Sequence, residues 1–186
     1  MDETRNGETI AGERFANLTN AEFEDCVFES CDFKSTALSG VRFVSCTFKS
    51  CDFSNVNLSG ARFRDPVFRE CKLLGVQWTR AGDLVNPAFH DSHLAYGNFA
   101  GLKLKKSVFE KCNIRDADFA DADLSEGDFR GSDLLNARFH ATGLAKADLR
   151  GALNYLIDPV SNRVRGLRAS MPDAQGLLFG LGVRLD

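Results

Sequence analysis

The chain has 186 residues, a length typical of a single domain. Its formal net charge is −3 and it contains no basic run, so direct nucleic acid binding through a cationic surface is not expected. Residues 1–20 lack the charged start and apolar centre of a signal peptide, and no apolar stretch reaches the length of a membrane span. We therefore expect a cytoplasmic protein without membrane contact.

The chain divides into three segments, of which the first, residues 1–15, is expected to be a short lead-in. Over residues 16–151 a large apolar residue recurs at every fifth position, and 14 of the 16 phenylalanines occupy this series. A period of five keeps the large residues on one side of neither an α-helix nor a straight strand. Each unit of five residues must therefore be a short extended piece followed by a bend.

The number of units in one circuit follows from a longer repeat. Residues 26–45 align without gaps to residues 46–65, with 11 of 20 positions identical. A repeat of 20 residues places four units in each circuit, and successive circuits stack as parallel strands. The pattern predicts an all-β, quadrilateral parallel β-helix of about seven coils, a solenoid of the kind that fixed short repeats indicate.

The expected core contains the large residue of each unit and the small residue two positions before it. All six cysteines occupy the small position, where a free cysteine behaves as a small buried hydrophobe. Their spacing does not suit a zinc site, so neither a metal nor another cofactor is expected. The core prediction includes Phe28, Phe48, Phe68, Trp78 and Phe109, and the stacked Cys31, Cys51 and Cys71.

The repeat slips by one residue at 79–83, directly after the only tryptophan. One interpretation is a bulge that restores the register, with Gly82 relieving strain in the backbone. The other is a local protrusion that shapes a binding surface.

Residues 152–186 are expected to form a C-terminal cap and dimerisation segment. Ser170 reads as a helix N-cap that is followed by a proline and an acid, and the helix is expected to end near Leu181. The open end of a solenoid needs a cover, which this segment supplies either within the chain or as the interface of a symmetric dimer. We favour the dimer, with Leu177, Leu178, Leu181 and Val183 in the interface.

The sequence does not predict an enzyme. The three histidines fall at outward positions, and no spacing suggests a catalytic triad. Most aspartates precede the large residue of a unit, where their side chains are expected to bond to the backbone of a turn. A packed square tube also offers no cavity for a substrate.

The units A-D-F-A-D, A-D-L-S-E and A-D-L-R-G (residues 117–121, 122–126 and 147–151) resemble the signature of the pentapeptide-repeat family. The ending Y-L-I-D-P-x-x-N-x-V (155–164), followed by S-M-P-x-A-x-x-L-L (170–178), is similar to that of the topoisomerase-protecting group, which includes the Qnr and albicidin-resistance proteins. The resemblance implies a right-handed β-helix, a homodimer joined through the C-terminus, and binding to DNA gyrase or topoisomerase IV by partial imitation of DNA.

Residues 115–133 carry seven acids and two arginines, a local charge of −5. We therefore predict Asp116, Asp118, Asp121 and Asp133 as partner-binding residues. The resulting hypothesis is a non-catalytic protein that protects a topoisomerase from a poison; the alternative is a β-helical scaffold for an unrelated protein partner. Folding the repeat onto four sides also collects basic residues on one wall, which a uniform DNA mimic would not carry: Arg42, Arg62, Arg64, Lys103, Lys105 and Lys106.

Overall fold

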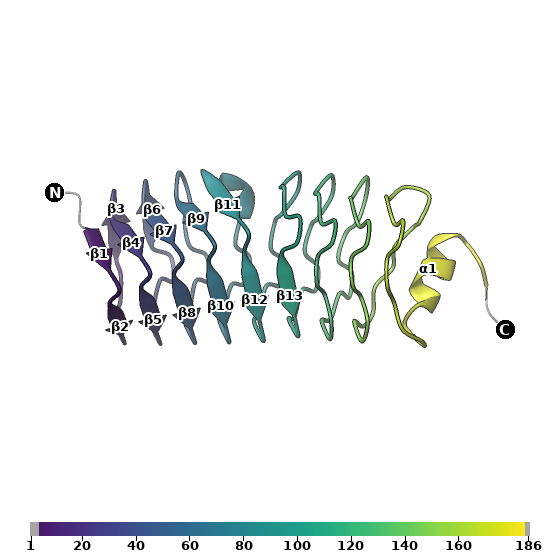
Figure 1. The fold of residues 1–186 in the computed structure, drawn as a ribbon, viewed down its shortest axis with the longest axis horizontal. Coiled ribbons are helices and arrows are strands. Elements are labelled where there is room, and N and C mark those ends of the chain that lie inside the picture. The colour runs from purple at the N-terminus through teal and green to yellow at the C-terminus, as the bar shows by residue number, and fades with distance from the viewer. Residues whose placement is uncertain (1–3, 185–186) are drawn as a thin grey trace.

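The computed structural model describes residues 4–184 and forms a straight rod of stacked coils with one short helix at its C-terminal end (Figure 1). Each coil has four sides because every fifth residue turns a corner. The corner residues have left-handed backbone angles, as at Asp25 (φ 52°), Ser30 (φ 52°) and Ser35 (φ 58°), and glycine takes over at corners such as Gly40 (φ 71°).

The four walls are named here from their strands and bridges. Wall C consists of isolated bridges such as Asp32 to Asp52, and wall D continues from its two strands through bridges at Gln77 and Asn98. Wall A contains β1 (Thr4–Asn6), β4 (Glu22–Glu24), β7 (Arg42–Val44), β9 (Arg62–Arg64) and β11 (Asp83–Val85). Wall B contains β2 (Thr9–Ala11), β5 (Val27–Glu29), β8 (Thr47–Lys49), β10 (Val67–Arg69), β12 (Ala88–His90) and β13 (Val108–Glu110). Wall D begins with β3 (Asn17–Thr19) and β6 (Ala37–Ser39).

All strand pairs are parallel and in register, so the predicted quadrilateral parallel β-helix with a short C-terminal helix is confirmed. The regular strands span about five turns, slightly fewer than the predicted seven, and isolated bridges continue the ladder beyond them. The ladder also passes the predicted bounds of 16–151 at both ends. β1 and β2 occupy the expected lead-in, and Leu153, Arg163 and Arg168 pair with the preceding coil.

Stacked aromatic rings fill the centre of the rod. Phe28 stacks on Phe48 and Phe48 on Phe68 with centroid distances of 5.0 and 4.8 Å, because parallel strands in register place identical residues one rung apart. Phe28, Phe48, Phe68, Trp78, Phe109, Cys31, Cys51 and Cys71 are all buried.

The buried cysteines also satisfy backbone carbonyls near the corners. The Sγ of Cys51 donates to the Phe28 carbonyl oxygen at 3.4 Å, and the Sγ of Cys71 donates to that of Phe48 at 3.4 Å. Within residues 4–184 the six thiols are free, and no group of three or more His, Cys, Asp or Glu side chains is placed to hold a metal.

The one-residue slip is absorbed at a single corner between walls D and A. A 3-10 turn, η1 (Trp78–Arg80), takes up the extra residue, and its ribbon bulges beside β11 in Figure 1. In the coils directly before the slip the paired residues are 20 positions apart, as in Phe48 and Phe68, and across the slip they are 21 apart, as in Phe68 and Phe89. In the first coil the spacing is 18, as in Ile10 and Phe28. The register is therefore restored within one coil.

The C-terminal helix α1 (Gln175–Gly180) is shorter than predicted. Ser170 is not its N-cap, because the Ser170 hydroxyl accepts a hydrogen bond from the Gly151 amide at 2.9 Å and so belongs to the last coil. The helix begins after Ala174 and ends at Gly180, close to the expected position. None of the helices within residues 4–184 combines the length and apolar character that crossing a membrane requires.

Candidate functional site

The four predicted partner-binding aspartates lie around two adjacent walls near the C-terminal half of the rod. Asp116 and Asp121 are exposed corner residues with φ of 57° and 60°, and Asp118 lies between them on wall D. Asp133 lies on wall C, where it pairs with Asn113 of the preceding coil. We call these four residues the acidic ridge, which runs from wall C across wall D to the far corner of that wall.

Two of these aspartates hold the backbone of the coil as well as facing solvent. Asp118 Oδ1 accepts from the Ala120 amide at 2.9 Å, and Asp133 Oδ1 accepts from the Leu135 amide at 3.1 Å. These bonds close a turn over two residues, as the sequence predicts for an aspartate that precedes the large residue. An asparagine would keep the same acceptor and remove only the charge.

Both aspartates are also paired with arginines. Arg138 of the next coil lies 3.6 Å from Asp118, and Arg115 lies 2.6 Å from Asp133. Burial alone would raise the pKa of Asp133, but hydrogen bonds from Asn154 and Arg115 outweigh it and hold that pKa below its usual value. Asp133 therefore stays ionised and is already partly neutralised.

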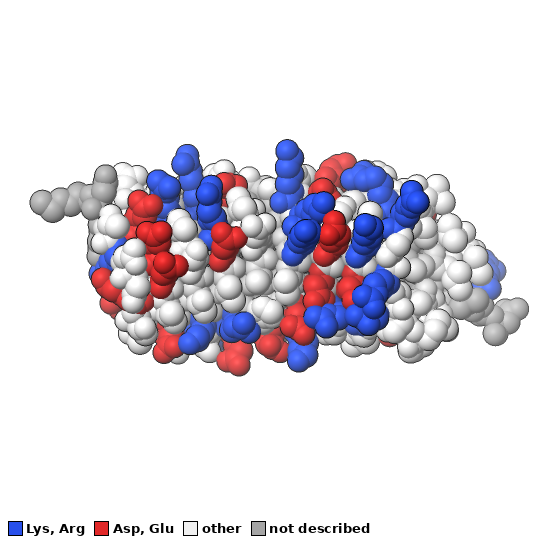
Figure 2. Space-filling view, viewed as in Figure 1, with Lys and Arg blue, Asp and Glu red and all other residues white. Residues whose placement is uncertain are grey.

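Charges from neighbouring coils reduce the acidity that the sequence indicates for residues 115–133. Glu126 lies 3.1 Å from Lys105 and 3.8 Å from Lys106, both from the coil before it. Within residues 4–184, Asp116 and Asp121 have no ion pair, and Asp116 accepts a hydrogen bond from Asn136 at 3.1 Å. On the face drawn in Figure 2, acidic and basic side chains alternate over most of the rod.

The basic residues that the repeat assigns to one side do lie on wall A. Arg42 is paired in register with Arg62, which shares β9 with Arg64, and Lys103 bridges to Asp123 on the same wall. Wall A therefore carries these basic side chains, whereas Asp118 and Asp133 lie on walls D and C.

The C-terminal end presents an apolar surface around α1. Leu177, one of the four residues predicted for the dimer interface, is partly buried and packs against the core of the rod. Leu178, Leu181 and Val183 are 40, 51 and 41% exposed. Phe179 and Met171, which the sequence argument did not single out, are 48 and 72% exposed. Both residues lie close to Leu178 in the segment that the sequence predicts to be helical, and this proximity is the signal that could have identified them.

This helix is seated directly on the last coil. Cβ atoms added at Gly176 and Gly180 would collide with the carbonyl oxygens of Tyr155 and Ile157, so the glycines permit the close approach. A hollow of about 380 Å³ beside the helix is lined by Leu135, Tyr155 and Phe179 among others. The helix therefore covers the open end of the solenoid and leaves its outer side apolar.

A four-sided parallel solenoid with a large apolar residue in every fifth position defines a class of proteins built from pentapeptide repeats. Family models agree: a pentapeptide repeat region matches residues 21–99, and the pentapeptide repeats model matches residues 98–131 and 117–153. The chain belongs to the pentapeptide-repeat family. A comparison with curated protein sequences gave no match.

Two solved structures share the fold over almost the whole chain. QnrB1, a plasmid-mediated fluoroquinolone resistance protein, is 22% identical with a TM-score of 0.56 and covers 98% of this chain and 100% of its own. HetL, a pentapeptide-repeat protein involved in heterocyst differentiation regulation in the cyanobacterium Nostoc, is 15% identical with a TM-score of 0.61, covering 92% of this chain and 90% of its own. The structural similarity over these lengths shows a common fold.

Proposed function

We propose that this protein is a non-catalytic partner of DNA gyrase or topoisomerase IV that occupies part of the DNA-binding surface and protects the enzyme from a poison. The observation that carries the proposal is the ridge of Asp116, Asp118, Asp121 and Asp133 on a straight rod of stacked coils. The fold shared with QnrB1 supports it. Such a protein acts in the cytoplasm, where the chromosome lies.

The length of the rod suits a DNA-like shape. Wall B contains six strands and three further rungs at Asp128, Asp148 and Arg168. Nine rungs spaced by about 4.8 Å span about 38 Å, the length of about 11 base pairs at 3.4 Å each. Two rods joined end to end would extend over about 23 base pairs.

The apolar outer side of α1 supports a homodimer joined through the C-terminal ends. Leu178, Phe179 and Leu181 are between 40 and 51% exposed on one surface, and a contiguous exposed apolar patch indicates an interaction site. An interface between two copies about a two-fold axis would cover both patches at once. In this arrangement the inner side of α1 covers the last coil of its own chain, and the outer side contacts the second copy.

The proposal is tested by the supercoiling activity of gyrase with the purified protein titrated in, in the presence and absence of a quinolone or albicidin. We expect the protein either to restore supercoiling under the poison or to inhibit the enzyme on its own. The triple variant Asp116→Asn, Asp118→Asn and Asp121→Asn should lose this effect, because it removes three negative charges while the Asp118 turn keeps an acceptor.

The matched control is Asp25→Asn, Asp52→Asn and Asp65→Asn, which removes the same charge from the N-terminal half of the rod. Equal loss in both variants would point to overall charge and count against the ridge. Full protection by a folded ridge variant would overturn the mimicry proposal.

The interleaved charges favour a second candidate, a β-helical scaffold that binds a protein other than a topoisomerase. Ion pairs between successive coils, such as Glu29 with Lys49 at 2.9 Å, give much of the rod an alternating surface unlike the uniform charge of DNA. Absence of any effect on gyrase and topoisomerase IV by a folded protein would select this function.

A further inference from the structure

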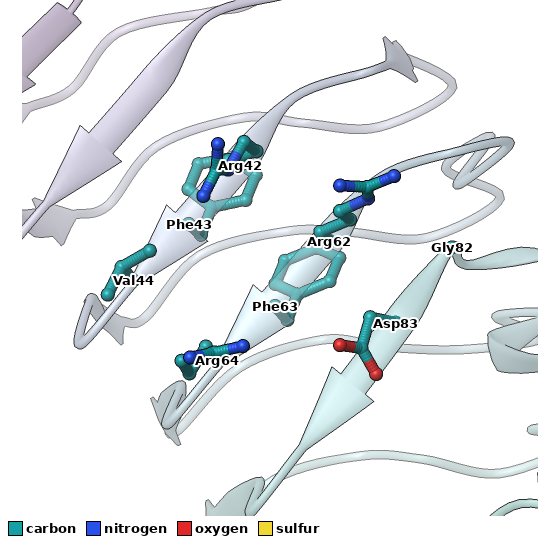
Figure 3. Close-up of a pocket in the computed structure, with 8 residues that line it drawn as sticks. All are labelled: Arg42, Phe43, Val44, Arg62, Phe63, Arg64, Gly82 and Asp83. Carbon is teal, nitrogen blue, oxygen red and sulfur yellow. The ribbon is translucent and has the colours of Figure 1, made fainter.

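Wall A carries a hollow that the proposed function does not use. It has a volume of about 180 Å³ and lies over β7, β9 and β11, at the point where the slip brings Gly82 beside Arg62 (Figure 3). Three arginines and one aspartate line it together with other residues of the three strands: Arg42, Arg62, Arg64 and Asp83.

Two of these arginines have no counter-ion. Arg62 and Arg64 are exposed, and within residues 4–184 neither forms an ion pair or a side-chain hydrogen bond. Asp83 is the in-register neighbour of Arg62, yet their charged groups are directed apart, as Figure 3 shows. The hollow thus holds two guanidinium groups with all their donors available.

An ion pair elsewhere on wall A shows which kind of group such a guanidinium binds. Arg42, in register with Arg62, pairs with the carboxylate of Glu22 on the preceding strand at 3.6 Å. Guanidinium groups match carboxylates in geometry and charge. Arg62 and Arg64 are two residues apart on one strand and lie on the same side, about 6.6 Å from each other along the chain. An extended peptide presents its own alternate side chains at the same interval.

We infer that Arg62 and Arg64, assisted by Arg42, bind a short acidic segment of a protein partner whose carboxylates stand at alternate residues. Glu22 and Glu24 on β4 and Asp83 on β11 limit the basic surface to about two rungs. A basic surface of that width and one strand in length suits two or three carboxylates. A nucleic acid strand, with one phosphate for every 3.4 Å of axis, would run onto the acidic neighbours.

This contact goes beyond the proposed function and does not depend on it. The basic hollow opens from wall A, whereas the acidic ridge follows walls C and D. A rod that places its ridge on one partner can therefore hold an acidic segment with wall A at the same time.

The test is fluorescence anisotropy with a labelled ten-residue peptide of alternating glutamate and serine, compared with the glutamine–serine peptide and with a duplex oligonucleotide of equal charge. We expect saturable binding of the glutamate peptide alone. The double variant Arg62→Gln and Arg64→Gln should weaken it by about tenfold or more, since each charged hydrogen bond is worth about that factor.

The matched control removes two exposed lysines from wall C, Lys34→Gln and Lys72→Gln, and should leave the affinity within about twofold because screening limits the reach of a distant charge. Circular dichroism confirms that both variants are folded. Equal weakening in the control, stronger binding of the duplex, or no saturable binding of the glutamate peptide would each overturn the assignment.

Discussion

At the scale of the residue, the aspartates before the large apolar residues serve the backbone first. Asp32, Asp52 and Asp128 each accept a hydrogen bond from the amide two positions on, at 2.9 to 3.0 Å. This role follows from sequence, since an aspartate at a bend has few other local partners. Arg130 neutralises Asp128 from two positions along the same coil, whereas Arg14, which pairs with Asp32, comes from the preceding coil, and that pairing required the structure.

The cysteines make the rod sensitive to alkali. Burial raises the pKa of the Cys46 and Cys112 thiols to about 12 from an ordinary value of 9.0. In the unfolded chain they ionise near pH 9, so the stability that the neutral thiols contribute is fully present below pH 9 and is lost as the pH rises toward 12. At pH 10 we expect a loss of about 1.4 kcal/mol for each thiol.

Urea unfolding at pH 7 and pH 10 measures this loss. The variant Cys46→Ala and Cys112→Ala serves as the control, because its stability should change less between the two pH values whatever the cost of the substitutions at pH 7. An identical pH dependence in both proteins would exclude the thiols as its source.

At the scale of the element, the period of five residues predicted the walls. The conformations of the slip at 79–83 and of the C-terminal segment could be determined only from the structure. The sequence located the slip at 79–83, and the structure shows a 3-10 turn there in place of a simple bulge. The helix start was predicted too early because Ser170 bonds to the last coil instead of α1. A capping residue is recognised from local sequence, but its actual partner lies 19 positions away.

The seating of α1 depends on two glycines. In Gly176→Ala the new methyl group would meet the Tyr155 carbonyl oxygen, and in Gly180→Ala it would meet that of Ile157. We expect either change to displace the helix and leave the coils intact, because each collision lies where the helix is seated on the backbone of residues 155–158. Hydrogen exchange should rise over residues 171–184 and stay unchanged over residues 26–65.

Gly7→Ala is a suitable control, since a Cβ there meets nothing within 4 Å and its backbone strain falls at the other end of the rod. Unchanged exchange at α1 in both helix variants would show that the glycines do not set its position.

At the scale of the whole molecule, the surface charge depends on stacking more than on local composition. The sequence balance of −5 over residues 115–133 suggested a strongly acidic coil. Successive coils lie one rung apart, however, so residues that are distant in the sequence become neighbours. Arg138 pairs with Asp118, and Lys105 pairs with Glu126. A charge count along a solenoid must therefore be made between residues one circuit apart.

The proposed dimer predicts a simple change in mass. Leu178→Glu with Phe179→Glu places two charges on the outer side of α1 and should convert a dimer of about 41 kDa into a monomer of 20.5 kDa in light scattering, because burying unpaired carboxylates is costly. Leu74→Glu with Tyr96→Glu, also at exposed apolar positions but remote from the end, should remain dimeric. A wild-type monomer at all concentrations would refute the dimer.

Residues 26–45 and 46–65 share 11 of 20 positions and each complete one circuit, so the length of this protein is set by the number of such blocks. Loss or duplication of such a block joins a corner to an equivalent corner, so the ends, the cap and the walls are retained while one rung is removed or added. Unequal recombination between the two gene segments would then alter the reach of the molecule in steps of about 4.8 Å. A change in the number of blocks thus alters the length of the rod, and with it the fit to a partner, while the contacts within each coil are kept.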